Sequence, residues 1–207
     1  YKGEKGDRVK FTVYSERDYS EAVAAGKILA ESTNFARDLV NTAPSDMTPI
    51  LLAQKAAAQA ELCGVSYEIL GEREIEELGM GSFLAVARGS DNPPRLIVLR
   101  YRGDPDSDST VALVGKGITF DTGGYDIKDA DGMATMKSDM GGAAAVIGAI
   151  LAIARSGIRA NVTAVVAACE NRISGSAYLP SDVLRTMSGK TVEVVNTDAE
   201  GRLTLID

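Results

Sequence analysis

The 207-residue chain is long enough to bury a substantial core, and its 45% hydrophobic and 25% charged residues are ordinary for a globular protein. Its formal net charge of −7, from 22 basic and 29 acidic residues, disfavours nucleic-acid binding, which needs a basic face. The sequence contains no histidine, which excludes Ser-His and Cys-His nucleophile pairs and histidine-ligated zinc within this chain. Any chemistry must therefore come from carboxylates, lysines, arginines or backbone groups.

Helical and strand-like patterns alternate along the chain, and Thr48 and Pro49 form a helix start, as N-cap and first helical residue. This alternation predicts an α/β fold with a mixed, largely parallel sheet flanked by helices. The predicted helices cover residues 16–41, 49–62, 72–78 and 140–154. The predicted strands cover residues 10–14, 65–70, 82–86, 95–101, 110–114, 161–168 and 191–195.

The same sequence predicts a location in the reducing cytoplasm and no membrane segment. The chain opens without the charged and apolar regions of a signal peptide, and the apolar run 140–154 is too short to span a bilayer. Cys63 and Cys169 lie far apart in apolar surroundings, which is typical of buried free thiols.

A glycine-rich segment follows the strand predicted at 110–114. Gly115 and Gly117 begin a dinucleotide-binding pattern, but Phe120 stands where its third glycine belongs, and no Gly-Lys-Ser/Thr triplet of a P-loop opens a helix here. We therefore reject both kinds of phosphate site for this segment. Instead we expect a turn, flanked by Lys116 and Asp121.

Acidic residues gather near the predicted ends of strands. Asp198, Glu200 and Arg202 follow the strand predicted at 191–195 and would project from one face if the chain stayed extended. Asp121 follows another strand, and Asp139 begins the apolar helix. Each residue alone is consistent with a solvated turn charge, but four carboxylates brought together would repel each other unless divalent cations neutralised them.

Three segments, 114–124, 136–140 and 196–203, closely resemble the motifs of the leucyl aminopeptidase family of dinuclear metallopeptidases, and they occur in that family's order. The last, Asn-Thr-Asp-Ala-Glu-Gly-Arg-Leu, is the family signature. The resemblance extends from about residue 16 to the end of the chain. It implies a connector and linker helix over 1–44 and a metallopeptidase catalytic domain over 45–207, without the family's C-terminal portion.

Carried over position by position, the resemblance implies a complete set of site residues. The metal ligands would be Lys116, Asp121, Asp139, Asp198 and Glu200, with Asp121 and Glu200 bridging two ions. Lys128 would be the catalytic lysine that polarises the scissile carbonyl, and Arg202 would anchor a bicarbonate acting as general base. The substrate would contact Lys128, Met136 and Asp139.

The activity implied is release of N-terminal residues, preferably leucine and other bulky apolar residues, from peptides by a water activated by two metal ions. Zinc is the usual metal, with manganese, magnesium or cobalt at one looser site. The resemblance also implies a cytoplasmic homohexamer. The alternative is a catalytically silent fragment or pseudoenzyme that acts as a binding or assembly element. Nucleic-acid binding is a third, weaker hypothesis.

The chain departs from the family pattern in one loop. Leu179 and Ser181 stand where the family usually has arginine and glycine. We expect this difference to alter the loop without touching a predicted metal ligand.

Overall fold

The computed structural model describes residues 9–12 and 14–207. A four-stranded sheet in the order β1-β2-β4-β3 forms its centre, and the strands β5 and β6 form a separate hairpin. The strands are β1 (Ser66–Leu70), β2 (Arg95–Arg102), β3 (Thr110–Asp121), β4 (Asn161–Asn171), β5 (Val183–Arg185) and β6 (Thr191–Glu193). The α-helices are α1 (Ser20–Asn41), α2 (Pro49–Leu62), α3 (Glu72–Glu77), α4 (Gly81–Ala87), α5 (Ala130–Met133), α6 (Gly141–Arg155) and α7 (Glu200–Leu205), with 3-10 turns η1 (Met136–Ser138) and η2 (Thr197–Ala199).

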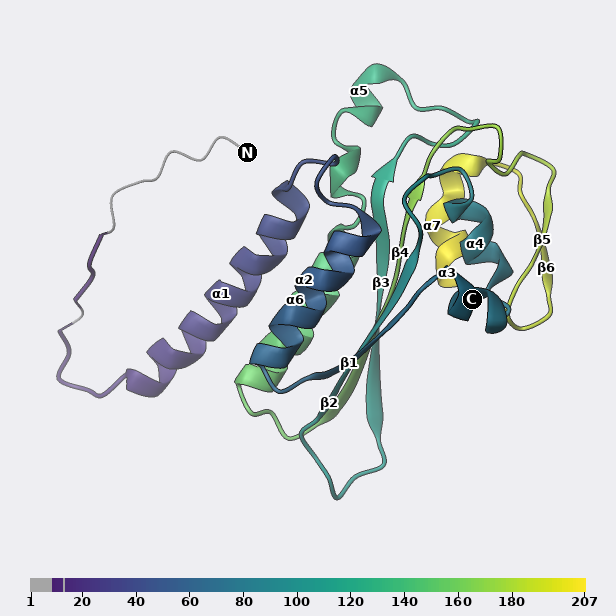
Figure 1. Cartoon of the computed structure of the whole chain (residues 1–207). Helices are drawn as coiled ribbons and strands as arrows, with labels where there is room; N and C mark the ends of the chain where they lie inside the picture. The colour runs from purple at the N-terminus through teal and green to yellow at the C-terminus, as the bar shows by residue number, and fades with distance from the viewer. Residues whose placement is uncertain (1–8, 13) are drawn as a thin grey trace.

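Helices cover both faces of the central sheet, with α1, α2 and α6 on one side and α3, α4 and α7 on the other (Figure 1). Alternate residues of β4 supply the two cores: Val162 and Val166 pack with the first group of helices, whereas Ala167 and Cys169 pack with the second. The prediction of an α/β fold with a mixed sheet flanked by helices is confirmed. The expectation that this sheet is largely parallel is not met, because β3 pairs with β4 in parallel while β1–β2 and β2–β4 are antiparallel.

Helix α6 is the apolar segment that the sequence places in the core. Its residues Ala143, Ile147 and Ile150 are fully buried in the core that includes α1 and α2. Within the described residues, the stretch Met136–Arg155 is the one that is long and apolar enough to cross a membrane. The core helix of a soluble protein meets the same criterion, and the packing of α6 fits that role.

Several predicted element ends are confirmed at atomic detail. The Thr48 side chain accepts a hydrogen bond from the Leu51 amide at 3.2 Å, and Pro49 is the first residue of α2. Gly79 adopts a positive φ of 74° just after α3, as expected of a residue that ends a helix. The proposed division of the chain at residue 44 stays a prediction. Leu39 of α1 packs in the same core as residues of α2 and α6.

Four predicted strands differ from the structure. Residues 82–86 form part of α4, because a short apolar run fits a buried helix as well as a buried strand. The strand predicted at 110–114 continues to Asp121, and its first residues are exposed rather than buried. Residues 191–195 are expected to be a buried strand, but only Thr191–Glu193 pair, in a hairpin with β5, and these three residues are exposed or half-buried. Residues 10–12 and 14 form no strand, and residue 13 lies outside the described residues.

The loop that departs from the family pattern holds a strained residue. Pro180 and Ser181 occupy the central positions of a turn closed by the Asp182 amide on the Leu179 carbonyl, at 3.1 Å. Ser181 has φ of 73°, a left-handed conformation that this turn position requires and that favours glycine. Among the described residues, it is the one non-glycine residue with positive φ.

We expect Ser181→Gly to raise the free energy of unfolding by about 0.5–1 kcal/mol, because glycine adopts this conformation without strain. Urea unfolding followed by circular dichroism measures the effect. Ser109→Gly is a suitable control, since Ser109 is exposed and has no positive φ; there glycine should lower stability slightly. A Ser181→Gly protein that is no more stable than the original would contradict the strain argument.

Candidate metal centre

The candidate centre lies at the carboxyl ends of the parallel strands β3 and β4. Asp121 ends β3, Asn171 ends β4, and the two residues are partners in the strand register. Ligand sites of α/β sheets lie outside such strand ends. The segment containing Asp198 and Glu200 passes here, since the Asn171 side-chain amide donates to the Thr197 carbonyl oxygen at 3.0 Å.

Lys116 links two of the predicted metal ligands. Its Nζ lies 2.6 Å from Glu200 Oε1 and 2.9 Å from Asp139 Oδ1. Burial acts to lower the pKa of Lys116, but the hydrogen bonds to Glu200 and Asp139 outweigh it, so the pKa is raised. In the environment that the chain itself provides, Lys116 is therefore an ammonium ion. A role as metal ligand requires the loss of that proton.

Glycines make room for Lys116 and its partners. A Cβ atom on Gly115 would lie 2.8 Å from Ala143 Cα, so this glycine lets α6 approach β3 closely. A Cβ atom on Gly201 would lie 2.8 Å from the end of the Lys116 side chain. Gly115 therefore serves close packing within the continuous strand β3, and Gly201 of α7 leaves space for the Lys116 side chain. The prediction that Lys116 and Asp121 flank a turn is wrong, because both residues belong to β3.

Lys128 links the other two predicted ligands. Its Nζ lies 3.0 Å from Asp121 Oδ2 and also forms a close ion pair with Asp198 Oδ1. Burial alone would lower the pKa of Lys128, but the hydrogen bonds to Asp198 and Asp121 raise that pKa well above its usual range. Lys128 is thus a protonated side chain beside the carboxylates.

The carboxylates converge closely enough to share a cation. Oxygens of Asp121, Asp198 and Glu200 lie within 4.8 Å of one another. Two buried oxygens, Asp139 Oδ2 and Glu200 Oε2, have no hydrogen-bond partner within the described part of the chain. Burial raises the pKa of Asp139 to about 6, against the opposing effect of the Lys116 ammonium. Buried carboxylate oxygens left without donors fit a divalent cation, for which oxygen is a common ligand.

Arg202 and Met136 form none of the ion pairs that link the lysines and carboxylates of this cluster within the described residues. Residues 200–205 form α7, where successive side chains are about 100° apart, so Arg202 points away from Glu200. The expected extended arrangement of Asp198, Glu200 and Arg202 is therefore wrong, although Asp198 and Glu200 do converge. Arg202 is exposed and lines a cavity of about 480 Å³ together with Asp198. Met136 begins η1 and is half-buried.

Sequence reasoning missed the buried polar residues that hold the ligands. The Asn171 side chain donates to Asp121 Oδ1 at 2.8 Å, and the Tyr178 hydroxyl donates to the Thr197 carbonyl oxygen at 2.7 Å. Both side chains are at most 1% exposed. The sequence does show that Asn171 follows a predicted buried strand. Its place beside Asp121, however, could be predicted only by knowing that β3 pairs with β4.

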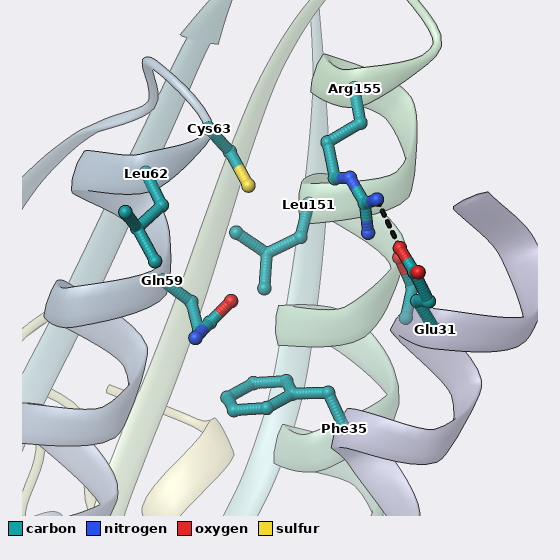
Figure 2. A pocket seen from close by; sticks show the side chains of 8 residues that line it. Glu31, Phe35, Gln59, Leu62, Cys63, Leu151 and Arg155 are labelled. Carbon is teal, nitrogen blue, oxygen red and sulfur yellow. Dashed lines mark hydrogen bonds and ion pairs between the residues drawn. The ribbon is translucent and has the colours of Figure 1, made fainter. Parts of the chain in front are cut away.

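Another pocket lies between α1, α2 and α6, with a volume of about 350 Å³ (Figure 2). Phe35 and Leu151 line it, Arg155 pairs with Glu31 at its edge, and burial raises the pKa of the Cys63 thiol there. None of the predicted site residues lines this pocket, so the candidate chemistry remains at the strand ends.

The fold and the site together define an α/β protein with a carboxylate-rich candidate cation site at the ends of two parallel strands. The chain belongs to the cytosol aminopeptidase family, because the model of that family's catalytic domain matches residues 34–207.

Two relatives named "Probable cytosol aminopeptidase" come from clostridia. The protein from Clostridium perfringens (strain 13 / Type A) is 52% identical over 217 residues, which cover 100% of this chain and 44% of the relative. The protein from Clostridium tetani (strain Massachusetts / E88) is 55% identical over 181 residues, covering 87% of this chain and 38% of the relative. The chain therefore spans less than half the length of these relatives.

Proposed function

We propose that this chain carries the metal site of an aminopeptidase that releases N-terminal residues, preferably leucine and other bulky apolar residues, from peptides. The observation that carries the proposal is the convergence of Asp121, Asp198 and Glu200 oxygens within 4.8 Å, beside buried carboxylate oxygens without donors. The relatives' printed names support an aminopeptidase reaction, and the preference for leucine is part of the proposal.

Two divalent cations are the proposed cofactors, with zinc as the usual metal and manganese, magnesium or cobalt at one site. Lys116, Asp121, Asp139 and Glu200 would hold one ion, while Asp121, Asp198 and Glu200 would hold the other. When bound, such a pair lowers the pKa of water and polarises a carbonyl group. The negative charge of four carboxylates supports this assignment, since two ammonium groups only partly neutralise it.

The remaining residues would position substrate and protons. Lys128, held protonated by Asp121 and Asp198, would donate a hydrogen bond to the scissile carbonyl oxygen as negative charge develops there. Arg202, beside Asp198 in the 480 Å³ cavity, would hold a bicarbonate that accepts a proton. Met136 would line the pocket for the first side chain, and Asp139 would contact the substrate's α-amine.

Location and assembly follow the relatives and the family resemblance. We propose a cytoplasmic enzyme, consistent with relatives named as cytosol aminopeptidases, and a homohexameric assembly. Peptides with a free N-terminus would be its substrates.

Hydrolysis of leucine p-nitroanilide with added zinc or manganese tests the proposal. We expect activity that a chelator abolishes and that Asp198→Ala removes, whereas Asp131→Ala, which changes an exposed carboxylate on α5, should retain it. Activity that survives both chelation and Asp198→Ala would overturn the metal mechanism. A protein that binds metal yet hydrolyses no peptide would instead support a catalytically silent role.

A further inference from the structure

We propose that Asn171 is a positioning residue that fixes the orientation of the metal-binding carboxylate Asp121 and its spacing from the segment that carries Asp198. The inference rests on the proposed function, because it assumes that Asp121 and Asp198 bind cations. Asn171 itself touches neither substrate nor metal in this proposal.

The Asn171 amide joins two segments that are far apart in sequence. It is fully buried at the end of β4, and its Nδ2 donates one hydrogen bond to Asp121 Oδ1 at 2.8 Å and another to the Thr197 carbonyl oxygen at 3.0 Å. Asp198 follows Thr197 directly. One side-chain group therefore sets the position of Asp121 relative to the segment that carries Asp198.

The same bond selects which oxygen of Asp121 faces the cluster. Asp121 Oδ1 accepts from Asn171 and from the Gly123 amide, both at 2.8 Å. With two N–H donors on Oδ1, the other oxygen, Oδ2, turns toward Lys128 at 3.0 Å. Asn171 thus presents Oδ2 to the place where a cation would bind.

Thr197 anchors the second segment independently. Its hydroxyl donates to the Gly123 carbonyl oxygen at 2.7 Å and accepts from the Asp126 amide at 2.8 Å, and its own amide donates to Asp126 Oδ2 at 2.7 Å. The Tyr178 hydroxyl also holds the Thr197 carbonyl. Because the segment is fixed by several bonds, losing Asn171 should disturb Asp121 without unfolding its surroundings.

A purely structural asparagine occurs at the opposite end of β4. Asn161 is 2% exposed; its Nδ2 donates to the carbonyl oxygens of Asp104 and Ser107, and its Oδ1 accepts from the Asp104 amide at 3.1 Å. Asn171 differs in two ways. Its Nδ2 binds a carboxylate, and its buried Oδ1 has no partner within the described residues.

The unsatisfied oxygen shows what determines the orientation of Asn171. Turning the amide over would bring its oxygen against the Asp121 carboxylate, and two acceptors would then repel each other. The amide therefore keeps its donors on Asp121 although its oxygen is left unsatisfied, which costs free energy. Asn161, by contrast, has hydrogen-bond partners for both its amide nitrogen and its amide oxygen.

Titration with Co²⁺ tests the inference, using the full-length protein with Asn171→Ala and, as matched control, Asn161→Ala. We expect Asn171→Ala to weaken cobalt binding about 10–100-fold and to change the visible absorption of the bound ion, since residues that orient ligands typically have effects of this size. Asn161→Ala should lower stability to urea but leave cobalt affinity within about twofold, because its bonds lie at the other end of the strand.

The cobalt titrations distinguish a positioning role for Asn171 from a purely structural one. Equal cobalt affinity in Asn171→Ala and the original protein overturns the positioning role alone. If cobalt affinity falls equally in both asparagine variants, Asn171 is only a structural residue, and the positioning role is overturned as well. An original protein that binds no cobalt overturns the proposed function as well. If Asn171→Ala does not fold, Asn171→Ser replaces it: the shorter hydroxyl side chain keeps the site polar but removes the amide that joins Asp121 to the Thr197 carbonyl. Asn171→Ser should also weaken cobalt binding, and unchanged affinity contradicts the inference.

Discussion

Replacing Lys128 with methionine should reduce the hydrolysis of leucine p-nitroanilide about 10²–10³-fold while leaving the content of divalent metal at or above that of the original protein. The lost rate is the effect expected when a donor to a developing oxyanion is removed. The metal content should not fall, because Lys128 is an ammonium ion paired with Asp121 and Asp198. Without it, the two carboxylates repel each other and attract a dication more strongly.

Elemental analysis, steady-state kinetics and metal-dependent thermal shifts measure these effects together. The rise in melting temperature on adding zinc should be at least as large in Lys128→Met as in the original protein, since bound metal stabilises the folded state. Lys137→Met is the matched control: the Lys137 ammonium donates to the Asn41 carbonyl oxygen at 3.0 Å, outside the carboxylate cluster, and its loss should leave the rate nearly unchanged. Loss of metal from Lys128→Met would show that Lys128 is a ligand or a structural residue.

Local signals predicted the elements that do not depend on distant partners. The start of α2 follows from the capping hydroxyl of Thr48 and from Pro49, and the end of α3 follows from Gly79. The position of Asp139 just before α6 follows from the long apolar run after it. These features were readable because a few neighbouring residues determine each of them.

Predictions that depended on tertiary contacts were less successful. The glycines after Val114 suggested a turn, yet β3 continues to Asp121 because β4 pairs with it along this length. Residues 196–202 suggested an extended segment, but the short polar run carries no period of its own, and it forms η2 and the start of α7. Asn171 escaped notice because its importance depends on a partner 50 residues away in sequence.

Local sequence could show which residue types form the candidate site, but not how these residues pair with one another. The residue types were visible, since carboxylates and lysines near glycines stand out in a chain without histidine. The pairing of each lysine with two carboxylates from different segments was not visible. It appears only when β3 and the loop after it, the segment before α6, and η2 with the start of α7 come together, and this places Lys116 and Lys128 on different acidic pairs.

Glu200→Gln should reduce zinc affinity at least about 100-fold, whereas the equally buried Glu170→Gln should leave that affinity nearly unchanged. Both glutamates are 1% exposed, so both substitutions change one buried carboxylate to an amide of similar shape. Glu200 lies in the cluster with Asp121 and Asp198, and its Oε2 lacks a donor within the described residues. Glu170 instead accepts hydrogen bonds from Ser90 and Asn92, away from the cluster.

The stability of the metal-free proteins provides an independent measurement, because each substitution weakens a charge-assisted hydrogen bond. In Glu200→Gln the Lys116 ammonium loses its 2.6 Å carboxylate partner and keeps Asp139, and in Glu170→Gln the Ser90 hydroxyl loses a charged acceptor. We expect each change to lower the free energy of unfolding by about 2 kcal/mol. If zinc affinity fell equally in both variants, the fall would be explained by their similar loss of stability, and Glu200 would not be a ligand. A loss of affinity confined to Glu200→Gln, with comparable losses of stability, would identify Glu200 as one of the carboxylates that hold the cation.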